Sequence, residues 1–379
     1  MKPQKNFLLD WCKRLLKTSA LAVLLITLSL GLSAGWFGSD DSSQPARKSA
    51  LAQGDAVTDP NAILRNALPI DNETVRNLQA DLENISGYLK SKRWSNVSRD
   101  LKQASRILTY SRDKLLASVP DDRQPQGSAL IDDIKEGVDE LRELAETKDK
   151  ETVLAKKNEL LKPITALEQL MVQGFPFEVP QEYSNLPQLL GRATVELSTT
   201  KGDMTLVLDG YNAPVTAGNF VDLVQRGFYD GLDFFGVEGF VIQTGNPPGD
   251  EQGFIDPDTG EYRAVPLEVF VRGEEEPIYG MTLEDAGIYL PDLALPFNSY
   301  GAVAQARPDM DPNGGSSQFF FFKFDTELTP PGFNLMDGRY AVFGYLVEGK
   351  EVLRKLTDED KIISAKVVDG IQNLVEPQV

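Results

Sequence analysis

Apolar residues recur at steps of three and four between residues 61 and 173, which is the spacing of one face of an α-helix. The recurrence falls into four runs, and the clearest break between them is Pro120 to Gly127. Asp71 is the expected N-cap of the first run, Trp94 opens the second, and Pro163 is expected to kink the fourth. The runs are carried by Val75, Leu78, Leu82, Ile85 and Leu89; by Val97, Leu101, Ala104, Leu108 and Leu115; by Ile131, Ile134, Val138, Leu141 and Ala145; and by Val153, Leu160, Leu161, Ile164, Leu167 and Leu170. This pattern predicts an antiparallel four-helix bundle over residues 53–173.

Beyond a Pro-containing linker over residues 174–191, the apolar period shortens to two, which is the period of a β-strand. Residues 193–199 and 203–209 alternate on either side of a short turn and predict a hairpin, and a helix is expected to begin near Pro214. Further strand patterns begin near Gly239, Gly301, Phe319, Tyr340 and Ile362. Residues 246–298 predict an elaborated loop region with at most short elements. Many strands with few helices predict a closed antiparallel β-barrel with flanking helices over residues 192–379.

The first 52 residues predict an export signal followed by a polar spacer. Basic residues stand before an uncharged run from Thr18 to Ser39, as in the n-region and h-region of such signals. A small-x-small site follows near Ala34 and another at Ala50 to Ala52. The alternative is an uncleaved membrane anchor over residues 18–39, because this run is long enough to span a bilayer. Both interpretations place the rest of the chain outside the cytoplasm.

The amino-acid composition limits which catalytic and metal-binding groups the protein can contain. The chain has no histidine and a single cysteine, Cys12, which precedes the uncharged run. These absences exclude Ser-His and Cys-His nucleophiles, histidine zinc sites and disulfides from the body of the protein, and we expect no metal and no cofactor. The net charge is −19, and that of residues 53–379 is −23, from 31 basic and 54 acidic residues. Such an acidic surface argues against a nucleic-acid partner.

Four motifs in the second half of the chain resemble the signature strands of cyclophilins. They are Gly239-Phe240-Val241-Ile242-Gln243-Thr244-Gly245, Ala302-Val303-Ala304-Gln305-Ala306, Gly315-Ser316-Ser317-Gln318-Phe319-Phe320, and Met336-Asp337-Gly338-Arg339-Tyr340-Ala341-Val342-Phe343-Gly344. They occur in the family's order, after Asn219-Phe220 as its first-helix marker, and the resemblance covers residues 193–374. Together with the export signal, the helical region and the acidic insertion, the chain resembles the thylakoid-lumen cyclophilins of cyanobacteria and chloroplasts.

The resemblance implies a peptidyl-prolyl cis-trans isomerase. Amide resonance sets a barrier of about 20 kcal/mol to rotation about an X-Pro bond, and a catalyst needs only to favour the twisted state. By position, the implied catalytic residues are Gln243, which would hold the substrate carbonyl, and Phe240 of the proline pocket. The implied substrate-binding residues are Val241, Ala304, Gln305, Gln318, Phe320, Leu335, Met336 and Tyr340.

Several pocket positions depart from the pattern of the family. Where most cyclophilins have an arginine that donates to the prolyl nitrogen, this chain offers Phe235 or Gly236, and neither has a side-chain donor. Leu335 replaces the usual tryptophan and Tyr340 the usual histidine. Four arginines are candidates to reach in from loops, although Arg339 also suits a role at the surface of a turn: Arg263, Arg272, Arg307 and Arg339.

Three functions remain open from the sequence. The first is a prolyl isomerase of low activity, and the second is a non-catalytic chaperone that binds extended Pro-containing segments. In the third, the barrel is only a scaffold for the helical domain. The resemblance implies clients among lumenal or photosystem II proteins. The predicted location is the thylakoid lumen or the periplasm, and an anchor over residues 18–39 would add an association with the thylakoid membrane. The short linker suggests that the helical domain covers part of the groove.

Overall fold

The computed structural model describes residues 57–236, 239–257, 259–324 and 334–377. The predicted export signal or anchor, over residues 1–52, lies outside these ranges. Within them, no helix combines the length and the apolar character needed to cross a lipid bilayer.

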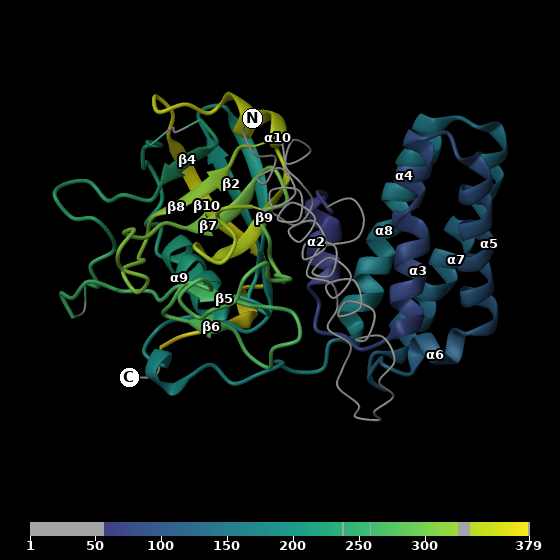
Figure 1. Cartoon of the computed structure of the whole chain (residues 1–379), viewed down its shortest axis with the longest axis horizontal. Helices are drawn as coiled ribbons and strands as arrows, with labels where there is room; N and C mark the ends of the chain where they lie inside the picture. Colours follow the sequence, from purple (N-terminus) through teal and green to yellow (C-terminus); the bar gives the residue numbers. More distant parts are fainter. Residues whose placement is uncertain (1–56, 237–238, 258, 325–333, 378–379) are drawn as a thin grey trace, which may run out of the picture. The chain divides into compact units, whose positions relative to one another are not determined.

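Six helices follow one another between Glu73 and Met171 and form the helical domain (Figure 1). They are α3 (Glu73–Glu83), α4 (Ile85–Lys90), α5 (Trp94–Tyr110), α6 (Arg112–Leu116), α7 (Gln124–Thr147) and α8 (Lys150–Met171). The apolar residues of the four predicted runs are buried together in one core, apart from half-buried Leu170 at its margin. The first and second runs are each divided into a longer and a shorter helix. A helical domain is therefore confirmed, whereas the simple four-helix bundle stays a prediction.

Three local features differ from the prediction or refine it. The N-cap of α3 is Asn72, so the choice of Asp71 was wrong by one residue: the Asn72 side chain accepts a hydrogen bond from Val75 N at 3.0 Å. Asn72 also donates to the carbonyl oxygen of Lys114 at 2.9 Å, which ties the start of α3 to α6. The break before α7 is shorter than expected, because that helix already begins at Gln124. Pro163 lies inside α8, which continues as one helix on both sides of it.

Helix α2 (Pro60–Asn66) precedes the helical domain, but its apolar face packs elsewhere. Ile63, Leu64 and Ala67 are buried in the same core as the strands of the second domain. Two carbonyl oxygens at the end of this segment are also held by that domain: Leu64 O accepts from Arg192, and Ala67 O accepts from Asn212 Nδ2 at 2.9 Å. Helix α2 is therefore part of the core of the second domain.

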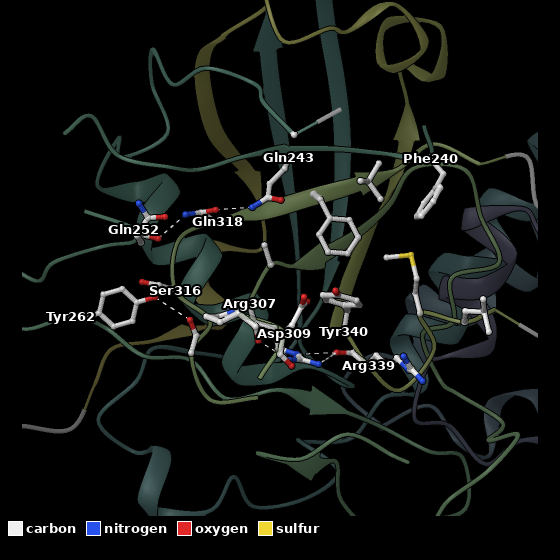
Figure 2. A pocket seen from close by; sticks show the side chains of 18 residues that line it. Phe240, Gln243, Gln252, Tyr262, Arg307, Asp309, Ser316, Gln318, Arg339 and Tyr340 are labelled. Carbon is white, nitrogen blue, oxygen red and sulfur yellow. Dashed lines mark hydrogen bonds between the residues drawn. The ribbon is translucent and has the colours of Figure 1, made fainter. Parts of the chain in front are cut away.

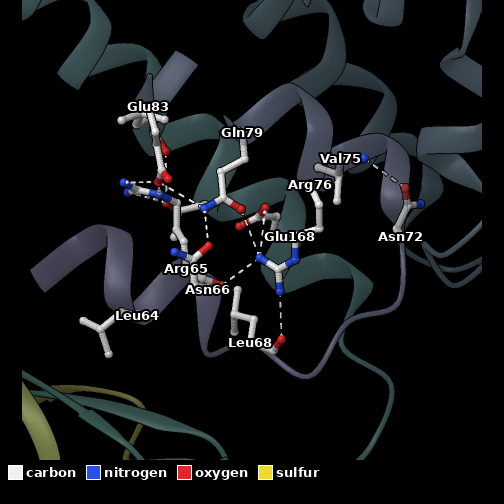
Figure 3. A network of polar contacts seen from close by, with 12 residues as sticks. Leu64, Arg65, Asn66, Leu68, Asn72, Val75, Arg76, Gln79, Glu83 and Glu168 are labelled. Atoms are coloured by element: carbon white, nitrogen blue, oxygen red, sulfur yellow. Dashed lines mark hydrogen bonds and ion pairs between the residues drawn. The ribbon is translucent and has the colours of Figure 1, made fainter. Parts of the chain in front are cut away.

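The polar side of the α2 segment bonds to α3 (Figure 3). Arg65 Nε donates to Glu83 at 2.8 Å, and Arg76 donates to Arg65 O at 2.8 Å and to Leu68 O at 2.9 Å. Arg76 also lies 3.4 Å from Glu168 of α8, whose side chain is fully buried. One short helix thus makes charged contacts with the helical domain and packs its apolar residues into the core of the strand domain.

The second domain is built on one curled antiparallel sheet (Figure 1). Its strands are β2 (Arg192–Thr199), β3 (Gly202–Asp209), β4 (Val241–Thr244), β7 (Ala302–Gln305), β8 (Phe319–Phe322), β9 (Val342–Glu348) and β10 (Ile362–Asp369), in the order β10-β2-β3-β9-β7-β8-β4. The predicted hairpin is β2 and β3, and the other strands begin within two residues of the predicted positions. Helices α9 (Pro214–Gln225) and α10 (Lys350–Lys355) contribute to the same core.

The sheet is open, so the predicted closed barrel is not confirmed. Among the residues that the structure describes, its edge strands β10 and β4 are linked by isolated bridges, from Asp233 to Lys361 and from Phe235 to Gln243. A physical reason lies in the connecting segment: Gly231 and Gly236 both have positive φ, which interrupts an extended strand. The sheet therefore curls into a half-barrel.

The linker and the insertion pack on this domain. Phe175 and Phe177 of the linker contact the rings of Tyr211 and Phe270, with centroids 6.4 and 5.8 Å apart. The linker then contains β1 (Gln188–Leu189), which pairs with the C-terminal strand β11 (Leu374–Val375). The described residues of the insertion form short elements, as predicted: β5 (Glu268–Val269) and β6 (Ile278–Tyr279).

Candidate functional site

A groove of about 900 Å³ opens on the strand domain, and Figure 2 shows its side chains. It lies over β4 and β8 and is lined by residues between 236 and 340. Eight of the ten sequence-predicted site residues line it: Phe240, Val241, Gln243, Gln318, Phe320, Leu335, Met336 and Tyr340. No described residue of the helical domain lines it, so the expectation that this domain covers the groove gains no support here.

The paired strands β4 and β8 form the floor of the groove. Gln243 stands directly opposite Phe320 in this antiparallel pair, so both side chains leave the same face of the sheet. The Phe320 ring stacks on Phe297 with centroids 6.0 Å apart, and Tyr340 meets it edge-on at 5.3 Å. This ring stack gives an amide-bearing strand a rigid apolar neighbour.

The Gln243 amide is oriented by a chain of side-chain hydrogen bonds (Figure 2). Gln243 Nε2 donates to Gln318 Oε1 at 2.6 Å. Gln318 Nε2 in turn donates to Asn246 Oδ1 at 2.9 Å and to Gln252 O at 2.7 Å. Because these two hydrogen bonds fix the Gln318 amide, the Gln243 amide is held in one orientation. The second N–H of Gln243 Nε2 is then available to the carbonyl of a ligand.

The apolar end of the groove is unusually open. Phe240 is 46% exposed and Leu335 is 73% exposed, although both are apolar. Phe320, in contrast, is only 4% exposed and forms part of the domain core. Exposed apolar side chains rimming a buried aromatic ring suit a site that takes a small apolar ring from a ligand.

Two predicted site residues do not line the groove. Ala304 is fully buried within β7, and Gln305 is 5% exposed. Gln305 Nε2 donates to three backbone carbonyls, those of Ala306, Ser316 and Gln318, at 3.3, 3.0 and 2.7 Å. Its side chain therefore fastens the segment that carries Gln318 and leads into β8, and its role in substrate binding stays a prediction. The same motif places the next residue, Ala306, in the lining.

The backbone beside Gln243 offers no side-chain donor. Phe235 exchanges two backbone hydrogen bonds with Gln243, at 2.8 and 3.0 Å, and Gly236 follows it in the groove wall. A Cβ added at Gly236 would lie 3.6 Å from Gln243 Cβ, which is ordinary contact. Space for a side chain therefore exists there, although its backbone φ of +61° is strained for any residue except glycine.

The four candidate arginines divide into two pairs. Arg263 is buried against Asp222 and Asp256, and Arg272 donates to Asn66 O at 2.8 Å; neither lines the groove. Arg307 and Arg339 do line it. Arg307 donates to carbonyl oxygens of Pro308, Asp309 and Arg339 and lies 5.2 Å from the Tyr340 ring centroid. Arg339 pairs with exposed Glu284 at 2.8 Å.

Two groove residues come from the insertion and were missed from the sequence. Tyr262 and Gln252 line the end of the groove that lies away from Phe240. Tyr262 is fixed there by a hydrogen bond from its hydroxyl to Gly314 O at 3.0 Å. The insertion has no periodic pattern that could have placed either residue. Their position gives this half of the groove a polar wall.

A half-buried carboxyl, that of Asp337, supports the ring stack. Asp337 accepts a hydrogen bond from Phe297 N at 2.9 Å, and Phe297 stacks under Phe320. Burial raises the pKa of Asp337 to about 6, against the opposing effect of that hydrogen bond. The loop that carries Met336 and Tyr340 is thereby attached to the ring stack.

Comparison with known proteins shows a family match for each of the two domains. Residues 194–372 match the family model of cyclophilin-type peptidyl-prolyl cis-trans isomerases, and residues 59–172 match the PsbQ-like domain of CYP38-like peptidyl-prolyl cis-trans isomerases. A solved cyclophilin of Cryptosporidium parvum matches 46% of this chain and 99% of its own, with 20% identity and a TM-score of 0.33.

Two relatives match most of the chain. A Synechocystis sp. protein named as a thylakoid lumen peptidyl-prolyl cis-trans isomerase is 60% identical over 96% of both chains. The chloroplastic isomerase CYP38 of Arabidopsis thaliana is 44% identical over 87% of this chain and 78% of its own. The chain therefore belongs to the cyclophilin-type peptidyl-prolyl cis-trans isomerases, among those with a PsbQ-like helical domain before the cyclophilin domain.

Proposed function

We propose that the groove binds extended segments with an X-Pro bond and catalyses rotation about that bond. The observation that carries this proposal is the placement of an oriented Gln243 amide opposite the Phe320 ring in one groove. In a bound segment the prolyl ring lies against Phe320, Phe240 and Met336. The carbonyl that precedes the proline accepts from the second N–H of Gln243. Holding both ends of the bond at fixed positions favours the twisted state over either planar one.

The rate is expected to be low. Gly236 stands beside Gln243 without a side chain, and the Arg307 guanidinium already donates to several carbonyl oxygens. The prolyl nitrogen therefore receives no charged donor from either residue. One missing preorganised donor typically lowers a rate by about two to three orders of magnitude. The same observation favours a second function, in which the groove binds Pro-containing segments as a chaperone and catalyses little.

The relatives suggest where and on what the protein acts. We infer a location in the thylakoid lumen, because the name of the Synechocystis relative gives that compartment and CYP38 is chloroplastic. The match to a PsbQ-like domain supports clients among photosystem II subunits and other lumenal proteins during folding or assembly. An uncleaved segment over residues 18–39 would add an association with the thylakoid membrane.

The test is the exchange rate of the cis and trans forms of a short Ala-Pro peptide, measured by NMR with the full chain and with Gln243→Ala. A rate above the spontaneous one that falls in the variant supports the isomerase. Protein signals of Phe240 and Tyr340 that shift with peptide, without faster exchange, support the chaperone instead. If neither exchange nor shifts appear, the groove is not a proline site.

A further inference from the structure

The region from Asn84 to Ser111 is positively charged, although the protein as a whole is negatively charged. It contains six cations and one acid, Asp100, whereas the whole chain has a net charge of −19. Asp100 is buried and accepts from Arg99 Nε at 2.8 Å, so it adds no carboxylate to the surface. All six cations are exposed, and the five from Lys92 onward define what we call the α5 cationic face: Lys92, Arg93, Arg99, Lys102 and Arg106.

Two arginines of this face are held in place instead of moving freely. The guanidinium groups of Arg93 and Arg99 lie over the ring of Tyr88, 5.5 and 5.9 Å from its centroid. Arg93 Nε also donates to Ser91 at 2.8 Å, and Arg99 Nη2 donates to the Tyr88 hydroxyl at 3.2 Å. A fixed guanidinium loses little side-chain entropy when it pairs with a carboxylate.

The rest of the face has the shape and composition of a protein interface. Lys102 and Arg106 line two adjoining hollows along α5, of about 270 and 350 Å³. Tyr110 borders the second hollow and is 84% exposed. Arginine and tyrosine are enriched where proteins bind each other, because both combine apolar area with directed hydrogen bonds.

We propose that the α5 cationic face binds an acidic segment of a partner protein, with carboxylates held by Arg93, Arg99 and Arg106. Charge complementarity selects an anionic partner, since this face is cationic within residues 53–379, whose net charge is −23. Fixed arginines favour protein carboxylates over a lipid surface, because an anionic bilayer attracts lysine and arginine alike through charge alone. The surface belongs to the helical domain and is separate from the groove residues.

The test separates hydrogen-bond geometry from charge. Binding of a short fluorescent peptide of glutamate and serine, without proline, is measured with the full chain and three triple variants. The first variant replaces Arg93, Arg99 and Arg106 with lysine and keeps the charge; the second replaces them with glutamine. The third is a matched control at exposed lysines elsewhere, Lys150→Gln, Lys355→Gln and Lys366→Gln. Binding of the same proteins to vesicles that contain anionic lipid is measured in parallel.

The proposal expects peptide binding that weakens about tenfold in the lysine variant, further in the glutamine variant, and not in the control. The N-terminal segment is identical in all four proteins, so its own affinity for vesicles cancels in the comparison. Absence of peptide binding would overturn the proposal. Equal peptide binding by the wild type and the lysine variant would also overturn it. A third contrary outcome is vesicle binding that depends on charge alone while peptide binding does not depend on the arginines. Sedimentation that shows self-association through this face would identify a second copy as the occupant, and would also overturn it.

Discussion

Gln243 and Phe320 face each other across the β4 and β8 pair, and the Gln243 amide is additionally fixed by Gln318. Side chains directly opposite in an antiparallel pair have Cβ atoms about 5 Å apart. That separation lets one residue hold the carbonyl before a proline while the other contacts the ring of the same X-Pro unit. The catalytic proposal depends on this register, since a slip of one residue would point Gln243 away from the groove.

Replacing Gln243 with alanine is expected to lower kcat/KM by about a hundredfold or more, because the oriented amide that we propose to hold the substrate carbonyl is lost. If the interaction forms only in the twisted state, kcat falls by the same factor and KM stays constant. Exchange NMR over a range of peptide concentrations separates the two constants. Gln103→Ala, at an exposed position of α5, is the control and should leave both unchanged. A rise in KM alone would show that Gln243 only binds the ground state.

A donor introduced at Gly236 should raise the rate. Gly236→Arg places a guanidinium next to Gln243, where an added Cβ meets only ordinary contacts. The positive φ at this position costs about 1 to 2 kcal/mol of stability, which a domain of this size tolerates. We expect an increase in kcat/KM of about tenfold or more in the exchange assay.

Gly236→Gln is the matched control, with the same backbone strain but no charge. An equal gain in both variants would mean that strain or packing, and not the charged donor, limits the wild-type rate.

The two phenylalanines of the groove should respond differently to truncation. Phe320→Ala removes a buried ring that stacks on Phe297, and we expect a loss of about 3 to 5 kcal/mol in the free energy of unfolding. Phe240→Ala removes a half-exposed ring and should cost less than about 1 kcal/mol in stability. Its effect should appear as weaker peptide binding, measured by NMR titration. Comparable destabilisation by both substitutions would contradict the assignment of Phe240 to a binding surface.

The sequence was informative where a site residue lies within a contiguous strand pattern. Phe240 directly precedes β4, and Val241 and Gln243 alternate within it with buried Ile242 and Thr244, so one contiguous motif carried the resemblance that located all three site residues. It was less informative at Gln305, because a polar residue in such a strand could face a ligand or fasten a neighbouring chain. The structure shows its amide donating to three backbone carbonyls, and its role in substrate binding stays a prediction.

The periodicity of apolar residues could not predict contacts between residues far apart in the sequence. Tyr262 enters the groove from an insertion without a repeating pattern, and its position depends on the hydrogen bond to Gly314. Helix α2 carries apolar residues, as the helices that follow it do. Which core its apolar face joins depends on Arg192 and Asn212, more than a hundred residues away in the chain. Such pairings are set by the fold as a whole and leave no local signature.

The position of α2 leads to a prediction about the cyclophilin domain. Ile63→Ala removes a side chain that is buried with the residues of the sheet, so it should cost about 2 to 5 kcal/mol in the unfolding of that domain. Denaturant titration followed by the near-ultraviolet signal of the buried Tyr229 and Tyr345 reports on it. The matched control is Ile131→Ala in α7, which should mainly affect the far-ultraviolet helical signal. Unchanged cyclophilin stability in Ile63→Ala would show that α2 is dispensable to this core.

Glu168 is expected to make stability depend on pH. Burial raises its pKa to about 7, although Arg76 and Arg65 oppose the shift, while Glu83 adds to it. In the folded state this carboxyl therefore binds a proton that it releases in the unfolded state between about pH 4.5 and pH 7. The stabilisation is fully present below the lower value and is lost as the pH rises through about 7. The size of the loss is on the order of 3 kcal/mol.

Glu168→Gln should remove this dependence, because the amide resembles the protonated carboxyl in shape and charge. We expect the variant to match the wild type near pH 5 and to exceed it near pH 8 in the free energy of unfolding, measured by denaturant titration of the helical signal. Glu143→Gln, at an exposed position of α7, is the control for the loss of one acidic residue. A wild type that is more stable near pH 8 than Glu168→Gln would mean that the ion pair with Arg76, 3.4 Å away, outweighs the burial of the charge.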